Sequence, residues 1–182
     1  QAPVSTTAHG EGKQLIIVSS TINSGDVGDK FRDLAVPVLN WEQAVQDNFR
    51  MTLDTATDHG TLVAQTQVNV VKADHSLAGG LTTGVKTVTT VAQDYSWGVP
   101  GPTAVVIAAV ADNPAQAVIY GYDRGAVLID GTTPAPARRV MFFSGNNSFA
   151  AFTEDAMKLF DAAVAWASGI EPLPPKTSAR IA

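Results

Sequence analysis

The sequence predicts an α/β domain, and three stretches of the chain carry that prediction. Residues 137–145 (ARRVMFFSG) contain a short apolar run typical of a buried strand, and residues 153–166 place apolar side chains at helical spacing. Residues 13–20 (KQLIIVSS) are another apolar run rich in β-branched residues, as in a parallel strand covered on both faces. A buried strand that leads into a capped helix is a common way for an α/β domain to close its sheet.

The size and composition of the chain are those of one folded domain. Its 182 residues are 45% apolar and 16% charged, which provides enough apolar material for a sizeable core. Residues 1–12 carry Pro, Ser, Thr and Gly with little apolar content, and residues 170–182 are Pro-rich. We therefore expect a lead-in or linker over 1–12, a single domain over 13–169 and a tail over 170–182.

The charge balance argues against two classes of partner. The formal net charge is −5 at pH 7, whereas nucleic-acid phosphates and anionic lipid surfaces select basic proteins. Apolar runs such as 103–111 (TAVVIAAVA) are also shorter than the ~20 residues of a membrane-spanning helix. We expect neither a nucleic acid nor a membrane as a partner.

The cysteine and histidine content limits the chemistry further. The chain has no cysteine, which excludes thiolate nucleophiles, thiolate metal ligands and disulfides. Its three histidines, His9, His59 and His75, show no metal-binding spacing. The loop 21–30 (TINSGDVGDK) lacks the ligand spacing of a calcium-binding EF-hand loop. We therefore expect no bound metal and no cofactor.

In the first third of the chain we expect two strands and a helix. The strand over 13–20 should be central in the sheet, because its apolar run suggests burial on both faces. Residues 31–34 allow one helical turn, and 36–39 (VPVL) predict a strand that is short because Pro37 cannot donate to the ladder. Approximately helical spacing of apolar residues predicts a helix over 41–51.

The middle of the chain predicts four strands. Polar and apolar residues partly alternate over 61–71 and 85–91, which is typical of exposed strands near a sheet edge, and these two segments are candidates for antiparallel pairing. The apolar segments 103–111 and 115–122 flank the turn-forming triplet DNP at 112–114. We expect these two segments to form a hairpin.

The closing helix has clear signals at both ends. Thr153 can cap the first turn, and Glu154 and Asp155 place carboxylates where the helix dipole favours negative charge. Apolar residues spaced over 156–166 provide a broad face for burial. Gly169 is the expected terminator.

Four short segments of the chain resemble one protein family. They are LIIVSS (15–20), HSLAGGL (75–81), RRVMFFSG (138–145) and the end of the last helix, from Leu159-Phe160 to Ala165-Trp166-Ala167-Ser168-Gly169. Over residues 13–170 the chain resembles the ThuA-like branch of the class I glutamine amidotransferase-like superfamily, which includes domains of secreted bacterial proteins. That family usually has Pro after the His of the second segment, as in HPLAAGL, where this chain has Ser76.

The resemblance implies a fold and narrows the function. The implied fold is a three-layer flavodoxin-like sandwich, with helices on both faces of a mainly parallel sheet that has antiparallel additions. Relatives that act as amidotransferases use a Cys nucleophile on a strand-to-helix elbow, and this chain has neither a Cys nor a G-x-S-x-G substitute. ThuA-like proteins are associated with sugar utilisation, and similar exported domains often accompany carbohydrate-active modules. The resemblance thus implies a carbohydrate-related role without amidotransferase chemistry.

Candidate ligand-binding residues follow from the general geometry of α/β sheets, in which ligands usually bind beyond the carboxyl ends of the strands. This rule selects residues after the predicted strands, namely Ser20, Thr21, Asn23, Trp41, Glu42, Asn146 and Asn147. Their amides and hydroxyls can pair with sugar hydroxyls, and Trp41 or Trp97 can offer a flat face to a sugar ring. The alternative for Trp41 is packing in the core.

Two further segments are candidates, each with a structural alternative. His75, which matches the family His, either hydrogen-bonds a ligand or caps a turn at the start of a short helix. Tyr122, Asp123 and Arg124 form either a site for an anionic group or a surface turn with a weak ion pair.

Three functions are compatible with the sequence. We prefer a non-catalytic accessory or carbohydrate-binding domain of an exported bacterial protein, because the nucleophile is missing and the candidate loops are polar and aromatic. One alternative is a structural or self-assembling extracellular subunit whose ends, 1–12 and 170–182, contact its neighbours. The other is a glycan-acting hydrolase with two carboxylates drawn from Glu42, Asp26 and Asp123.

The amino-terminal sequence bears on the location of the protein. It begins QAPVSTTAHGEG without an initiator Met, which favours a mature end left by signal cleavage over an excised piece of a longer chain. We therefore expect an extracellular or periplasmic protein.

Overall fold

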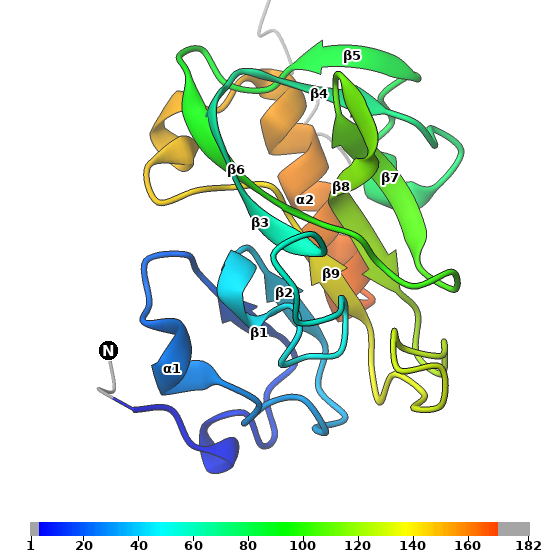
Figure 1. The fold of residues 1–182 in the computed structure, drawn as a ribbon. Helices are drawn as coiled ribbons and strands as arrows, with labels where there is room; N and C mark the ends of the chain where they lie inside the picture. Colours follow the sequence, from blue (N-terminus) through cyan, green and yellow to red (C-terminus); the bar gives the residue numbers. More distant parts are fainter. Residues whose placement is uncertain (1–3, 171–182) are drawn as a thin grey trace, which may run out of the picture.

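The computed structural model describes residues 4–170, which form one nine-stranded sheet with two α-helices and four 3₁₀ turns (Figure 1). The strands are β1 (Ile16–Val18), β2 (Val38–Asn40), β3 (His59–Gln65), β4 (Gln67–Val70), β5 (Gly84–Thr87), β6 (Gln93–Gly98), β7 (Val105–Val110), β8 (Asn113–Tyr122) and β9 (Arg139–Met141). The helices are α1 (Ser24–Val27) and α2 (Glu154–Ser168), and the 3₁₀ turns are η1 (Thr7–His9), η2 (Gln43–Val45), η3 (Ser76–Ala78) and η4 (Ser148–Ala151). Neither described helix combines the length and the hydrophobicity needed to cross a bilayer.

The strand order of the sheet corrects the prediction of a mainly parallel arrangement. The order is β1-β2-β9-β8-β7-β4-β5, and β6 pairs with both β3 and β8. Only the pairs β1–β2 and β2–β9 are parallel, and the six other pairs are antiparallel. Short connections explain this difference, because parallel neighbours need a long crossover whereas the β7–β8 turn contains only residues 111 and 112. The protein is therefore an α/β protein with a mixed, mostly antiparallel sheet.

The first strand lies at an edge of the sheet and not at its centre, so that prediction is wrong. β1 pairs only with β2. Ile16 and Val18 are buried, but Ile17 between them is 50% exposed. The apolar run LIIVSS therefore reflects burial of one face of β1, whereas Ile17 on the other face is half exposed.

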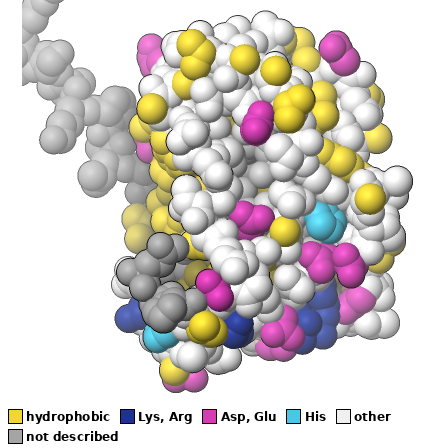
Figure 2. All heavy atoms as spheres, turned by 60° about the vertical axis from the view of Figure 1, so that its left-hand side comes forward, with side chains coloured by type: hydrophobic (Ala, Val, Ile, Leu, Met, Phe, Trp, Pro, Cys, Tyr) yellow, Lys and Arg dark blue, Asp and Glu magenta, His cyan; other side chains and the backbone are white. Residues whose placement is uncertain are grey.

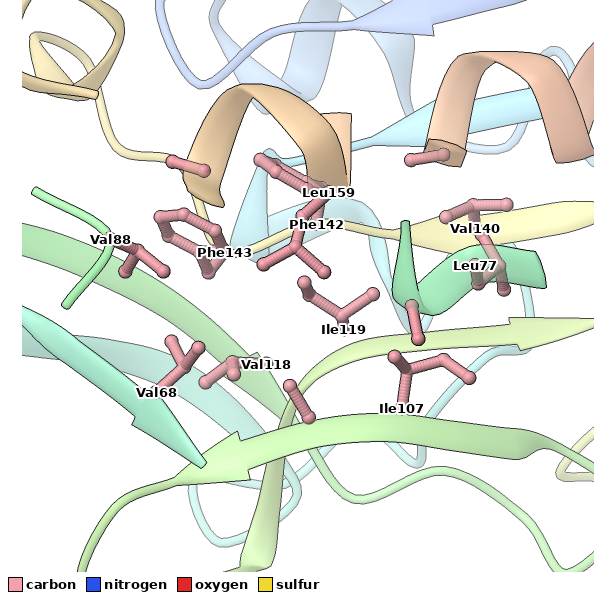
Figure 3. Close-up of a cluster of buried hydrophobic side chains, with 14 of the residues drawn as sticks. Val68, Leu77, Val88, Ile107, Val118, Ile119, Val140, Phe142, Phe143 and Leu159 are labelled. Carbon is pink, nitrogen blue, oxygen red and sulfur yellow. The ribbon is translucent and has the colours of Figure 1, made fainter. Parts of the chain in front are cut away.

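Both faces of the central strands are buried, by different kinds of structure. Leu39 and Val140 belong to a cluster that also contains Leu159 of α2, and Figure 3 shows Leu159 beside Phe142 in this cluster. The adjacent residues Val38 and Met141 belong to a second cluster, on the opposite face. That second face is covered largely by non-helical segments between residues 27 and 51. Helical cover over these central strands is therefore confined mainly to the α2 face.

The closing helix confirms its predicted ends. The Thr153 hydroxyl accepts a hydrogen bond from the Ala156 N–H, as an N-cap does, and also donates to the Thr87 carbonyl. Gly169 follows the last turn in the left-handed conformation, with φ of 70°, which favours glycine. The buried residues of the helix lie on one face, so α2 packs on the sheet as its pattern predicts.

The segment 41–51 is not the predicted helix. It contains only the 3₁₀ turn η2, followed by irregular turns. Arg50 has φ of 55°, which a right-handed helix cannot accommodate. The Gln46 side chain donates to the Trp97 carbonyl at 2.9 Å and accepts a hydrogen bond from Tyr120. The apolar residues in this segment are buried by tertiary packing. Their spacing happens to resemble that of a helix, so the periodicity rule predicts one wrongly.

The middle strands follow the predictions except that one predicted strand is divided in two and one strand, β6, was not predicted. The segment 61–71 divides into β3 and β4 at Thr66, and Ala64, with φ of 58°, lies at a register shift within β3. β3 pairs with β6, which the sequence analysis missed, and β4 pairs with β5 and β7. The antiparallel pairing of β4 with β5 and the β7–β8 hairpin are confirmed.

A buried arginine joins the loop before β2 to the start of β9. Arg139 is fully buried among apolar residues and makes no ion pair with another residue of the described chain. Its two terminal nitrogens donate at 2.9–3.2 Å to five backbone carbonyls, those of Arg32, Leu34, Val36, Ala137 and Arg138. The guanidinium thus satisfies a set of buried and half-buried carbonyls, of which that of Arg138 also accepts from the Val38 N–H in β2.

Candidate functional site

An open cleft of about 500 Å³ lies where the three parallel strands end. Its wall consists of Ser20, Glu42, Gln43, Thr61, Ala92, Gln93, Asp94, Ser96, Gly145, Asn146 and Asn147. Hydroxyls, amides and two carboxylates dominate this wall, and no aromatic side chain of the described residues contributes to it. The cleft is therefore a polar site that offers many hydrogen-bonding groups.

Three sides of the cleft are segments that follow β1, β2 and β9. Ser20 follows β1, Glu42 follows β2, and Gly145 to Asn147 follow β9. The buried Asn40 at the end of β2 fixes the next turn, because its Oδ1 accepts from the Glu42 N–H at 3.0 Å and its Nδ2 donates to the Glu42 carbonyl at 2.9 Å. The parallel part of the sheet thus brings residues more than a hundred positions apart to one edge.

The remaining side is formed mainly by β6 and the residue before it. The Ser96 N–H donates to the Phe143 carbonyl at 2.8 Å, and the Ser96 hydroxyl donates to the Trp41 carbonyl at 3.0 Å. A Cβ at Gly145 would lie 2.4 Å from the Asp94 carbonyl oxygen, so this close approach of the two segments requires glycine. β6 is thereby held against the ends of β2 and β9.

Glu42 is the most buried charged group in the wall of the cleft. Its side chain is 9% exposed, and its Oε1 accepts a hydrogen bond from the Ala44 N–H at 3.0 Å. Burial raises the pKa of the Glu42 carboxyl above its ordinary value, although the hydrogen bond from Ala44 acts in the opposite direction. Such a carboxyl is expensive to keep ionised without a partner, and a ligand that supplies a donor would stabilise it.

Two other polar groups of the wall have distinct environments. The Gln43 side-chain oxygen lies 3.2 Å from Nδ1 of His59, and Nε2 of His59 lies 3.8 Å from the Asp47 carboxylate. His59 thus positions Gln43 from outside the cleft. The Ser20 hydroxyl is buried and has no hydrogen-bond partner among residues 4–170. A buried hydroxyl without a partner is destabilising, so a ligand or water at Ser20 would be favourable.

The structure brings four of the predicted site residues together. Ser20, Glu42, Asn146 and Asn147 all line the cleft. The nearby Thr21 and Asn23 do not. The Thr21 hydroxyl lies 3.0 Å from the Ser19 hydroxyl, and the Asn23 side chain caps α1 by accepting from the Gly25 N–H. Both of these side chains serve the loop that follows β1.

The two tryptophans proposed as sugar platforms are packed in the core. Trp41 and Trp97 are each 7% exposed, and neither lines the cleft. The Trp41 indole donates to the Ser19 hydroxyl at 3.2 Å and packs against Phe149 and Phe160. Trp41 is buried because η4 and α2 cover it. The alternative of packing in the core is therefore correct for Trp41, and Trp97 is buried as well.

The remaining candidates lie away from the cleft. The His75 Nδ1 accepts from the Leu77 N–H and caps η3, its ring packs against Trp166, and burial lowers its pKa. Tyr122 is buried, with its hydroxyl donating to the Met51 carbonyl at 2.9 Å. Arg124 is exposed and lines a second, shallower cavity of about 480 Å³ at the opposite end of the parallel strands. Asp123 there pairs with Arg138 at 3.0 Å, which matches the alternative of a surface ion pair.

Sequence reasoning missed the residues that close the cleft. These are Gln43, Thr61, Ala92, Gln93, Asp94, Ser96 and Gly145. Most of them belong to β3, β6 or the segment before β6, and the rule about carboxyl ends does not select antiparallel strands. The sequence did contain one usable signal, since Gly145 lies between a buried strand and two asparagines and marks a close backbone approach.

The charged and polar groups of the cleft define what it can bind. Within residues 4–170, no three His, Asp or Glu side chains come together as the ligands of a metal ion would. The wall instead combines several hydrogen-bond acceptors and donors, as a ligand with many hydroxyl groups requires.

Two comparisons of the sequence with known proteins assign no family to the chain. No protein-family model matches the chain, and no curated protein sequence matches it.

Proposed function

We propose that the chain is a non-catalytic carbohydrate-binding domain of an exported bacterial protein and that the polar cleft binds the sugar. The observation that carries the proposal is the gathering of hydroxyl and amide groups at the carboxyl ends of β1, β2 and β9. The ThuA-like resemblance and the three-layer flavodoxin-like arrangement are part of the same proposal. They suggest a carbohydrate context, whereas the cleft suggests where the ligand lies.

The composition of the cleft supports a ligand rich in hydroxyl groups. Sugars present alternating donors and acceptors, and the amides of Gln93, Asn146 and Asn147 can pair with both. The missing cysteine excludes the nucleophile that the amidotransferase relatives use. Because Trp41 and Trp97 are in the core, recognition in this cleft would depend on hydrogen bonds and not on stacking.

The proposal predicts a saturable thermal shift with a sugar. A ligand at 100 times its dissociation constant stabilises a fold by about 2.7 kcal/mol, which raises the melting temperature of a domain of this size by roughly 5–10 °C. We expect Asn146→Ala and Gln93→Ala each to weaken binding about fivefold, since each loses one neutral hydrogen bond of about 1 kcal/mol. The measurement is a screen of mono-, oligo- and polysaccharides, followed by titration calorimetry.

Gln14→Ala is the matched control for these two variants. Gln14 is exposed and lies before β1, at the end of the strand opposite the cleft. It should bind the sugar as the unmodified protein does. If no sugar in the screen shifts the melting temperature, the binding proposal is wrong and the self-assembling subunit takes its place, to be tested by concentration-dependent sedimentation.

A glycan-acting hydrolase is a second candidate, favoured by the presence of two carboxylates, Glu42 and Asp94, in the same cleft. The raised pKa of Glu42 suits a general acid, and Asp94 would be the second carboxylate. Asp26 and Asp123, the partners considered from sequence, do not line the cleft.

The hydrolase predicts release of reducing ends from a polysaccharide panel. Glu42→Gln should lower that rate at least about a hundredfold, because it removes the acid. Absence of product from every polysaccharide, with binding intact, would reject the hydrolase and leave the binding domain.

A further inference from the structure

We propose that the cleft prefers amino sugars, whose ring carries a protonated amine, over neutral or acidic sugars. The inference rests on the proposed carbohydrate-binding function and names the class of sugar. It comes from the distribution of charge around the cleft. Glu42 and Asp94 are the two charged side chains among its lining residues, and no Lys, Arg or His of residues 4–170 lines it.

The two carboxylates belong to different walls. Glu42 follows β2, and Asp94 is in β6, whose backbone at this residue approaches Gly145 in the loop after β9. A ligand in the cleft therefore meets acidic groups from two separate parts of the fold, the largely buried Glu42 and the exposed Asp94. Their negative potentials add within the cleft, because a cleft lined by charges of one sign concentrates the field.

Neither carboxylate is neutralised by the protein. Glu42 and Asp94 form no ion pair within residues 4–170. One oxygen of Glu42 accepts the Ala44 N–H, and the other has no hydrogen-bond partner in the described chain. By contrast, Asp29 and Asp33 outside the cleft pair with Arg32. The cleft thus keeps unpaired negative charge where a ligand would bind.

The surroundings of these carboxylates favour an ammonium group. A protonated amine donates up to three hydrogen bonds, and hydrogen bonds between charged groups are stronger than neutral ones. Glu42 is largely removed from solvent, so a charged donor would restore stabilisation that burial takes away. Ser20 lines the same cleft, and its shielded hydroxyl has no hydrogen-bond partner among residues 4–170.

The same charges disfavour acidic ligands. A uronate or a sulfated sugar would bring a negative charge to a wall in which residues 4–170 supply no cation to receive it, and like charges at close range repel. Figure 2 shows one face of the molecule on which the Lys and Arg side chains lie toward the bottom, whereas Asp and Glu side chains are spread over much of the face. The net charge of −5 extends the preference for cationic ligands beyond the cleft.

The test compares one cationic tetrasaccharide with two neutral ones, by titration calorimetry in low salt at about pH 6, below the ordinary pKa of an amine. They are the tetramer of glucosamine, the tetramer of N-acetylglucosamine and cellotetraose. We expect the glucosamine tetramer to bind at least about tenfold more tightly than the two neutral sugars, which corresponds to about 1.4 kcal/mol. Added salt should weaken the binding of this tetramer and leave the neutral sugars unchanged.

Isosteric variants connect the preference to the cleft. Glu42→Gln and Asp94→Asn should each reduce the tenfold preference, and the double variant should remove it. Asp112→Asn is the matched control, because Asp112 is an exposed acid in the β7–β8 turn, outside the cleft. It should retain the full preference.

The outcomes separate this inference from the proposed function. Equal binding of all three sugars, or a preference that survives in the double variant, overturns the amino-sugar proposal and leaves sugar binding in place. Displacement of the bound glucosamine tetramer by an equal concentration of calcium chloride would assign the two carboxylates to a metal ion and also overturn it. Absence of binding by any of a wide range of sugars would reject both proposals.

Discussion

Replacement of Arg139 by methionine should lower the free energy of unfolding by about 4 kcal/mol, because it leaves buried carbonyls without donors. The Arg139 guanidinium donates to five backbone carbonyls in the loop before β2 and at the start of β9. Methionine fills most of the same volume but donates nothing. The measurement is urea denaturation followed by circular dichroism.

Two further variants keep this prediction testable if Arg139→Met does not fold. Arg139→Lys retains the charge with fewer and less spread donors, so we expect about half of the loss. Arg124→Met removes an exposed arginine whose side chain makes no hydrogen bond within residues 4–170, and it should change stability by less than about 0.5 kcal/mol. Equal effects of Arg139→Met and Arg124→Met would show that the buried carbonyls do not depend on Arg139.

Alkaline pH should destabilise the protein through its three tyrosines, all of which are buried. Burial raises the pKa of Tyr95 and of Tyr122 to about 12, and it raises the pKa of Tyr120 well above its ordinary value. Between about pH 10 and about pH 12 the unfolded chain loses phenolic protons that the folded chain keeps. The folded state then binds more protons, so the free energy of unfolding falls as pH rises through this window and is fully retained below it.

The expected loss at about pH 11 is roughly 3 kcal/mol. Each tyrosine contributes about 1.4 kcal/mol, since one pKa unit corresponds to that amount. Arg139 acts in the opposite direction, because burial lowers its pKa to about 10. Its effect on the free energy of unfolding cancels roughly the contribution of one tyrosine. The measurement is urea denaturation at several pH values, with ultraviolet absorbance to follow tyrosinate.

Tyr95→Phe is the control for the alkaline transition. The Tyr95 hydroxyl lies 2.6 Å from the Thr89 hydroxyl, and its removal should reduce the pH dependence by about one tyrosine while lowering stability at neutral pH only modestly. Tyrosinate that forms near pH 10 in a chain that is still folded would contradict the prediction.

The parts of the fold that sequence predicted are those with strong local signals. Thr153 and Gly169 mark the ends of α2 by capping chemistry that acts within a few residues. The β7–β8 hairpin is similarly local, since its strands are joined by a short turn. These features depend on neighbours in sequence, so a single chain is sufficient to predict them.

The errors arise where distant contacts decide the structure. Helical spacing over 41–51 comes from residues that pack into the core as irregular turns, with Gln46 bound to Trp97 and Tyr120. The position of β1 at the edge depends on the order in which strands pair, which an apolar run does not encode.

Only part of the candidate site was predicted, because the rest of it also depends on contacts between residues distant in sequence. Ser20, Glu42, Asn146 and Asn147 follow the parallel strands, where a general rule about α/β sheets applies. Gln93 and Asp94 come from an antiparallel strand that crosses to the same edge, and no rule of sequence pattern places them there. The missed residues include one of the two acidic groups of the cleft.

The place of β9 in the sheet has a consequence for how the protein reaches its native state. β9 is the last of the described strands to be synthesised, yet it lies between β2 and β8 and pairs with both. Before β9 is added, the parallel pair β1–β2 has no described strand that joins it to the rest of the sheet. Sheets that depend on such long-range pairing fold slowly, because chain entropy is lost before the contacts form. Ribosome-bound chains that end before residue 139 should therefore lack the cleft, and ligand competence should appear only after β9 and α2 emerge.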